Sequence, residues 1–218
     1  MTSALVLMMA DGRFPGGGHA HSGGLEAAVA DGSVHDGATL QSFLLGRLLT
    51  SGPTEAWFAA EAHRVSGRID ANRRDGQLAD LADRYEARTT SSAQRAAARA
   101  LGRGLRRVAR GLWPEADHIT VEPYPIVLGI AARHAGISDL DAARVAVHNL
   151  ITGPATAAPK LFAIDMVDAM RAAIALTQAV DRCAHHGLEP TPPPARSAPL
   201  SELRAQAHAT WDVRLFAS

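Results

Sequence analysis

The amino-acid sequence predicts an all-α protein, a helical bundle built as one domain. Three observations carry this prediction. The composition of the 218 residues is 47% apolar and favours alanine, leucine and arginine, which are good helix formers. β-branched and aromatic residues are scattered and rarely alternate with polar ones, so strand signals are weak. Apolar side chains instead recur three and four residues apart along most of the chain.

The first clear helix covers residues 39–50, and a second follows it directly. In the first, five side chains fall at helical spacing: Leu40, Phe43, Leu44, Arg47 and Leu48. Ser51 is suited to cap the second helix, which has Pro53 in its first turn and runs to about Ser66.

Six further stretches have the same helical periodicity. They are residues 76–87, 91–112, 123–135, 138–151, 158–186 and 200–216. Ser138 is a cap residue, and Asp139 and Asp141 follow in the first turn, where negative charge suits the helix dipole. Glycines mark three expected helix ends, at Gly136, Gly153 and Gly187.

The chain divides into a body, a spacer and a terminal helix. Residues 1–187 form the all-α body, and the proline-rich stretch 188–199, "LEPTPPPARSAP", is an extended linker. Residues 200–218 contain the last helix, with an apolar stripe made by Leu200, Leu203, Ala207, Trp211 and Leu215. Such a stripe must dock either on its own body or on a partner.

Composition excludes several classes of protein. The formal net charge is zero, so no overall field attracts nucleic acid or an anionic membrane. One cysteine, Cys183, cannot form an internal disulfide, and no apolar run is long enough to span a membrane. The first residues lack the basic region of a signal peptide. We expect a cytoplasmic protein.

The stretch "PGGGHAHSGGLE" at 15–26 is rich in glycine and raises the question of a ligand site. It lacks the Lys-Ser/Thr pair of a phosphate-binding loop, and His21 stands where a dinucleotide fingerprint needs glycine. In an extended segment His19 and His21 point the same way, which makes them weak candidates for one metal ion. The simpler explanation is structural. Glycine permits a positive φ and a close approach of the backbone, and a tight loop before a helix requires both.

The helix expected at 91–112 has a basic face opposite an apolar one. Six arginines share that face: Arg95, Arg99, Arg103, Arg106, Arg107 and Arg110. Two interpretations stay open, a solvated face balanced by acids elsewhere in the chain and a face that meets an acidic partner. Known catalytic motifs are missing, and Lys160, the only lysine, has no base partner that the sequence identifies. We expect no enzyme activity.

Several stretches together resemble the urease accessory protein UreF family. The first, "FPGGGHAHSGGLEAAV", is similar to the family's N-terminal pattern L-P-V-G-G-F-x-Y-S-x-G-L-E, with His19 and His21 in place of the Phe and Tyr, as in an actinobacterial variant. "PYPIVLGIAARHAGI" resembles an H-x-P-V-V-x-G-x-x-A segment, and "ARALGRGLRRV" resembles an R-x-G-R-x-L helix. "HATWDVRLFAS" resembles the family's terminal H-x-x-x-x-x-R-L-F-x-S motif. One stretch departs from the family: "LITGPATAAPKLFAID" lacks its paired Gly-Gln elements.

The resemblance implies a cytosolic, non-enzymatic scaffold that tends to dimerise. It implies binding to a UreD/UreH-like protein, to a UreG-like GTPase and to the urease apoprotein, so that nickel reaches the urease active site. No cofactor belongs to the chain itself, since the complex handles nickel and this protein holds it at most transiently. The expected partner-binding residues are Pro15, Gly17, Gly18, His19, His21, Ser22, Gly24, Glu26, Arg103, Arg106, Arg107, Trp211, Arg214, Leu215 and Phe216.

Two other hypotheses remain at this point. One is a small metal-dependent hydrolase that uses His19, His21, Cys183, His185 and His186. The other is a nucleic-acid module that reads phosphates through the arginine face, although no helix-turn-helix pattern flanks that run.

Overall fold

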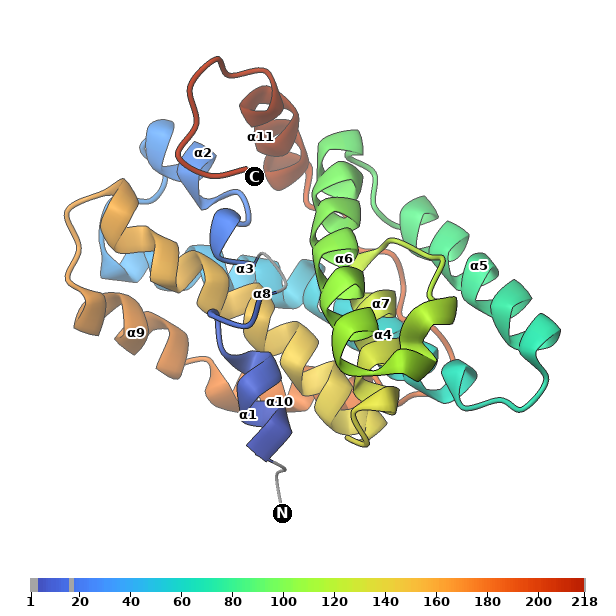
Figure 1. The fold of residues 1–218 in the computed structure, drawn as a ribbon. Helices are drawn as coiled ribbons and strands as arrows, with labels where there is room; N and C mark the ends of the chain where they lie inside the picture. The colour runs from blue at the N-terminus through green and yellow to red at the C-terminus, as the bar shows by residue number, and fades with distance from the viewer. Residues whose placement is uncertain (1–3, 16–17, 218) are drawn as a thin grey trace.

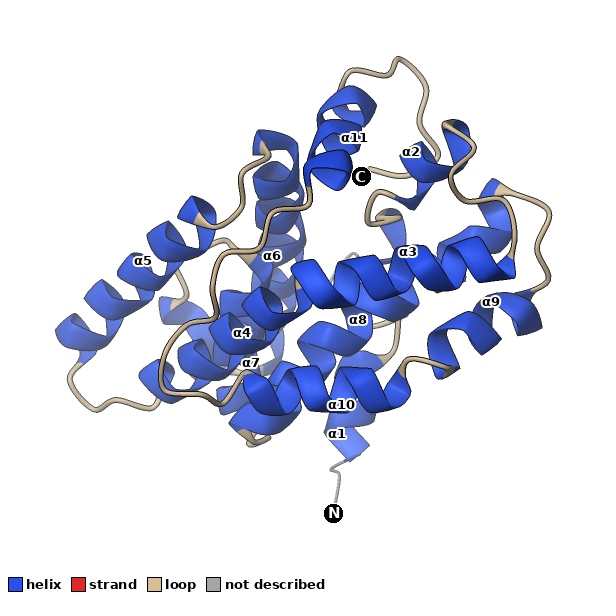
Figure 2. Cartoon of the chain, turned by 180° about the vertical axis from the view of Figure 1, so that it is seen from behind, coloured by secondary structure: helices blue, strands red, loops and turns tan. Residues whose placement is uncertain are grey.

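Helices are the only regular elements in the computed structural model, which describes residues 4–15 and 18–217 (Figures 1 and 2). The all-α prediction is confirmed. Within these ranges no helix is both long and apolar enough to cross a membrane. The elements are α1 (Ala4–Ala10), η1 (Gly18–Ala20), α2 (Leu25–Ala30), α3 (Gly37–Thr50), α4 (Gly52–Ser66), α5 (Ala71–Ala87), α6 (Ser92–Leu112), η2 (Pro114–His118), α7 (Tyr124–His134), α8 (Asp139–Leu161), α9 (Met166–Ile174), α10 (Thr177–His186) and α11 (Pro199–Ala209).

The helix α4 lies between two apolar clusters and contributes to both. Trp57 and Phe58 enter a cluster shared with α5, α6 and α7, while Ala56 and Ala60 enter a second one shared with α3, α8, α9 and α10. The ring of Phe58 meets that of Trp57 edge-on, with centroids 5.0 Å apart. Because one helix joins both clusters, the two halves of the bundle form one body.

Two glycines let helices approach to backbone contact. A Cβ on Gly129 of α7 would lie 2.1 Å from the carbonyl oxygen of Ala59 on α4. A Cβ on Gly102 of α6 would lie 1.6 Å from the carbonyl oxygen of Glu122. No side chain larger than hydrogen fits at either position without moving a backbone.

Side-chain capping begins five of the described helices, namely α3, α5, α6, α8 and α9. The Ser138 hydroxyl accepts a hydrogen bond from the Asp141 amide at 3.1 Å, as the sequence predicts for α8. Ser51 is the N-cap residue of α4, although its side chain makes no capping hydrogen bond. Gly187 ends α10, and Gly136 follows α7 with φ +71°.

The predicted stop at Gly153 and the predicted long helix 158–186 are wrong. The helix α8 continues through Gly153, Pro154 and Pro159 to Leu161. Tertiary packing outweighs these helix breakers, since Pro154 and the alanines that follow it are buried in the core. A new helix, α9, begins after Asp165, whose carboxylate caps it by accepting from the Val167 amide at 2.7 Å.

The last helix is shorter than predicted, because α11 ends at Ala209 and residues 211–217 are not helical. Trp211 and Leu215 therefore lie outside the stripe expected on residues 200–216. The linker lies along the body, where the Trp57 indole donates to the Glu189 carbonyl at 3.0 Å. The helix α11 itself packs between α6 and α2 (Figure 1).

We expect Gly102→Ala to reduce the free energy of unfolding by about 3 kcal/mol or more, because the added methyl overlaps the Glu122 carbonyl. The matched control is Gly76→Ala in α5, where a Cβ has nothing within 4 Å. That variant should gain about 0.5–1 kcal/mol from better helix propensity. Urea unfolding followed by circular dichroism measures both, and equal effects would contradict the tight crossing at Gly102.

Candidate functional site

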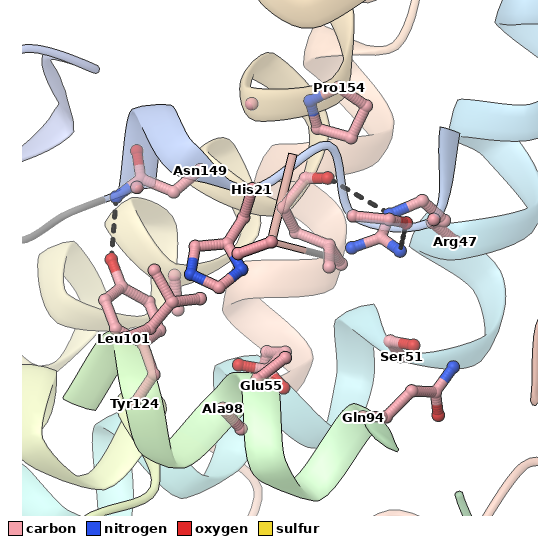
Figure 3. Close-up of a pocket in the computed structure, with 18 of the residues that line it drawn as sticks. His21, Arg47, Ser51, Glu55, Gln94, Ala98, Leu101, Tyr124, Asn149 and Pro154 are labelled. Carbon is pink, nitrogen blue, oxygen red and sulfur yellow. Dashed lines mark hydrogen bonds between the residues drawn. The ribbon is translucent and has the colours of Figure 1, made fainter. Parts of the chain in front are cut away.

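The glycine-rich loop packs against α3 and α8. Gly23 and Gly24 have φ of +62° and +88°, in the region that favours glycine. A Cβ on Gly23 would lie 2.9 Å from a guanidinium nitrogen of Arg47 and 3.1 Å from the Pro154 ring. The Arg47 guanidinium also donates a hydrogen bond to the Gly23 carbonyl (Figure 3). At this point the loop needs glycine for conformation and for space.

The other loop residues differ in where they lie. Pro15 and Gly18 are exposed, whereas Ser22 is fully buried and its hydroxyl accepts from the Glu26 amide at 3.3 Å. His21 lines a cavity between the N-terminal loop, α6 and α8 (Figure 3). Gly17 and the side chain of His19 lie outside the described part of the chain.

A buried carboxylate connects this loop to the C-terminal segment. Glu26 in α2 accepts hydrogen bonds from the amides of Leu215 at 2.8 Å and Phe216 at 3.1 Å. His208 of α11 lies 2.9 Å from the same carboxylate through Nε2 and is also buried. We call Glu26, His208, Leu215 and Phe216 the terminal clasp. Burial alone would raise the pKa of Glu26, but these hydrogen bonds outweigh it and hold the pKa below its usual value.

Other contacts fix the C-terminal segment against the same region. The Trp211 ring packs on His208 with centroids 4.8 Å apart, and the Lys160 ammonium lies 5.9 Å from the centre of the Phe216 ring. The Ala217 amide donates to the Ala20 carbonyl at 2.7 Å. Arg214 and Leu215 keep exposed side chains on this segment. The tail is thus held by its backbone and Phe216, with other side chains directed to solvent.

The arginine face of α6 is largely engaged within the chain. Arg99 pairs with Glu86, and Arg103 pairs with Glu122 at 3.1 Å. Arg106 donates to the Thr120 carbonyl at 3.0 Å. Arg95 and Arg110 likewise bond carbonyl oxygens, whereas Arg107 makes no such contact with the described residues. These contacts agree with a face compensated inside the chain and leave little of it for phosphates.

A cavity of about 940 Å³ lies between the N-terminal loop, α4, α6, α8 and the C-terminal segment. Its apolar walls include alanines of α6 and apolar groups of α1 and α8, and polar side chains line much of the rest. Polar side chains gather in its centre (Figure 3): Glu55 from α4, Tyr124 from α7 and Asn149 from α8. The Tyr85 hydroxyl donates to the Glu55 carboxylate at 2.6 Å, and the Asn149 amide donates to the Tyr124 hydroxyl at 2.9 Å.

The cavity holds two charged groups with shifted proton affinities. Burial raises the pKa of Glu55 to about 7, although Tyr85 and Arg47 act in the opposite direction. Burial lowers the pKa of Arg47 to about 10, so the guanidinium stays protonated at neutral pH. The nearest hydrogen-bond partners of Arg47 are carbonyls of Gly23 and Leu150. A carboxyl that titrates near neutrality thus borders a mainly apolar chamber.

The described side chains of the hydrolase hypothesis, those of His21, Cys183, His185 and His186, do not meet at one place. Cys183 is buried in the cluster around α3 and α8, where burial raises its pKa to about 11. His185 and His186 are exposed at the end of α10, and neither lines the cavity that His21 borders. The described residues hold no group of three or more His, Cys, Asp or Glu side chains suited to a metal ion.

Comparison with known proteins decides the family. A family model for UreF matches residues 34–177. The chain belongs to the UreF family. It is 41% identical over 219 residues to the urease accessory protein UreF of Mycolicibacterium vanbaalenii, covering 99% of this chain and 98% of that protein. UreF proteins of Mycobacterium marinum and Mycobacterium sp. (strain JLS) are 38% and 36% identical, each over 100% of this chain and 99% of the relative.

The family resemblance found at the two ends of the sequence has a structural counterpart. The N-terminal UreF signature supplies Glu26, and the terminal motif supplies His208, Leu215 and Phe216. These residues form a single clasp, so the two motifs are parts of one feature. Their roles in partner binding stay a prediction.

Sequence reasoning missed the polar groups of the cavity in this UreF-family chain. Glu55 lies three, four and seven residues before Phe58, Ala59 and Ala62, which places it on the same face of α4 as these three buried residues. A lone acid on an apolar helix face is the signal that points to it. Arg47 gives a similar signal, because it lies seven and three residues after the buried Leu40 and Leu44 of α3.

We expect Glu26→Gln to weaken the terminal clasp, because the amide cannot accept from both backbone donors and His208. Loss of a buried, charge-assisted network costs on the order of 2–4 kcal/mol at pH 7. The folded pKa lies below the unfolded value, so this contribution exists above the unfolded pKa of about 4.5 and disappears as the pH falls through the folded value. Hydrogen exchange at the Leu215 and Phe216 amides, with exposed Asp212→Asn as control, measures it. Unchanged protection in Glu26→Gln at pH 7 would contradict the clasp.

We expect Glu55→Gln to stabilise the protein at pH 8 by about 3 kcal/mol, and to have little effect at pH 4. The folded pKa of about 7 exceeds the reference value of 4.5, so stability decreases as the pH rises from about 4.5 to about 7. Glutamine has no proton to lose and can still accept from Tyr85. Chemical unfolding from pH 4 to 8 tests this, with the exposed Glu115→Gln as control. A difference between Glu55→Gln and wild type that does not depend on pH would contradict the raised pKa.

Proposed function

We propose that this UreF-family chain is a non-enzymatic accessory protein for urease maturation. The observation that carries the proposal is its 41% identity, over nearly the whole length, to a protein named urease accessory protein UreF. In this role it bridges a UreD/UreH-like protein and a UreG-like GTPase, so that nickel is inserted into the urease apoprotein. It acts in the cytoplasm as a homodimer, and it handles nickel at most transiently.

The outer face of α11 and the adjoining tail is the surface that we assign to the UreD/UreH-like partner. The apolar stripe of α11 points to solvent, with Leu200 58% and Leu203 68% exposed. The inner face is polar: the Gln94 amide donates to the Ser201 hydroxyl at 3.3 Å, and His208 reaches Glu26. Val213 and Leu215 continue the exposed apolar surface along the tail. A helix that buries polar groups and exposes leucines is organised for a second protein.

The arginine face of α6 is a weaker candidate for this partner. Arg99, Arg103 and Arg106 are already paired with acids of the same chain. Binding an acidic partner there would first break these ion pairs. For this reason we assign the contact to α11 and the tail rather than to α6.

We expect Leu203→Asp with Leu215→Asp to weaken capture of a UreD/UreH-like protein by about 100-fold or more, because two apolar contacts become charged. Urease activity should fall in parallel when all urease genes are coexpressed in a host without its own urease. The control is Ile69→Asp, a fully exposed apolar residue in the loop before α5. Full urease activation without this chain would refute the proposed function, whereas full activation by the double variant would refute only the assigned surface.

A further inference from the structure

Two histidine rings meet where η2 and α7 end. His118 is the last residue of η2, and His134 is the last residue of α7. Their ring centroids are 5.4 Å apart, and the ring planes are inclined by 65°. Both residues are half-buried, so the pair lies at the border between the packed interior and solvent. Neither histidine lines the cavity or belongs to the terminal clasp.

A hydrogen bond to the backbone determines the tautomer of His118. Its Nδ1 lies 2.7 Å from the carbonyl oxygen of Glu115. Because a carbonyl oxygen only accepts, Nδ1 carries the proton and donates it, and Nε2 of the neutral ring has a lone pair. Metal-binding imidazoles are held in the same way: one ring nitrogen donates to a backbone carbonyl, and the other binds the ion.

The Nε2 atoms of both rings are buried. Neither atom has a hydrogen-bond partner among the described residues. A buried polar atom without a partner is unfavourable, and most such atoms in folded proteins are satisfied. Two of these atoms on neighbouring rings therefore point to one ligand that satisfies both.

The separation of the two rings suits a single ion. A zinc ion lies about 2.0–2.1 Å from an imidazole nitrogen, and hence about 3.2 Å from the centre of the ring. At the tetrahedral angle, two imidazoles on one ion have ring centres about 5.2 Å apart. The observed separation of 5.4 Å is close to this value. An ion thus fits between the rings at the spacing that η2 and α7 already give them.

We propose that His118 and His134 bind one divalent transition-metal ion through their Nε2 atoms. Imidazole nitrogen favours Zn²⁺, Ni²⁺ and Cu²⁺, whereas Mg²⁺ and Ca²⁺ prefer oxygen ligands. The described residues provide no third His, Cys, Asp or Glu side chain placed to join the pair. Water fills the remaining coordination positions, so the site is open and binds more weakly than a structural site with four protein ligands.

The surroundings of His134 keep its ring neutral, which is the form that binds metal. Burial lowers the pKa of His134, and the neighbouring His118 lowers it further. The carboxylate of Glu115 acts in the opposite direction and offsets part of the charge of a bound ion. Arg74 and Arg133 also act on this ring and oppose a cation. This mixture of charges agrees with reversible binding.

Calorimetric titration of the untagged full-length chain with Zn²⁺, Ni²⁺ or Cu²⁺, each added alone, tests the site. The variant His118→Asn keeps a side-chain donor for the Glu115 carbonyl but removes Nε2. It should raise the dissociation constant by about 10-fold or more, and His134→Ala should do the same. Circular dichroism establishes that each variant remains folded.

The matched control is the double variant His185→Ala, His186→Ala. It removes two exposed histidines at the end of α10 and should leave the dissociation constant unchanged.

Metal-catalysed oxidation locates the ion without any substitution. Cu²⁺ with ascorbate oxidises the side chains that bind copper, and mass spectrometry of the digested chain identifies them. We expect oxidation at His118 and His134 but not at His185 and His186. This measurement decides the case even if a variant does not fold.

The possible results separate the site from the proposed function. Binding that His118→Asn and His134→Ala both weaken, or oxidation at these two histidines, supports the site. A wild-type chain that binds none of the three ions overturns it, as does full binding by a folded chain that carries both substitutions. A water molecule that bridges the two Nε2 atoms then accounts for them. Oxidation confined to other residues also overturns the site. Urease activation is measured separately, and neither result changes it.

Discussion

The carboxylate of Glu26 is buried where the first and last segments of the chain meet. Its partners are the backbone amides of Leu215 and Phe216 and the imidazole of His208. Because a buried carboxylate without partners is unfavourable, removal of the tail would leave this charge unpaired. The contact holds α11 in place together with the Gln94–Ser201 hydrogen bond and the Arg204–Asp31 ion pair. These polar contacts occupy the inner side of α11, so its leucines face solvent.

The cavity is a second place where the fold departs from a simple apolar bundle. Glu55 and Arg47 lie among alanines and leucines without a direct ion pair between them. Burial raises the pKa of Glu55 and lowers the pKa of Arg47, so the protein interior favours the neutral form of each group. A bundle selected for stability alone would fill this space with apolar side chains.

The solvent-facing side of α11 and the tail carries exposed apolar side chains. Leu200 and Leu203 lie on α11, and Val213 and Leu215 continue the surface beyond Ala209, where the backbone is no longer helical. The opposite side of α11 meets α6 and α2 through polar groups, so the body leaves these leucines uncovered.

The sequence by itself determined the fold class, the caps of α4 and α8, and the family, because helical periodicity, capping residues and short motifs are local properties. Tertiary structure decided the rest. The helix α8 continues through Gly153 and Pro154 because core packing outweighs local helix breaking. The C-terminal segment leaves the helix after Ala209, where its backbone amides bond the distant Glu26 instead of extending α11. The sequence leaves open whether the arginines of α6 are balanced by acids of the same chain or free for a partner, and in the structure acids and carbonyls from other segments satisfy most of them. Each of these outcomes depends on contacts between residues far apart in the chain, which no local pattern encodes.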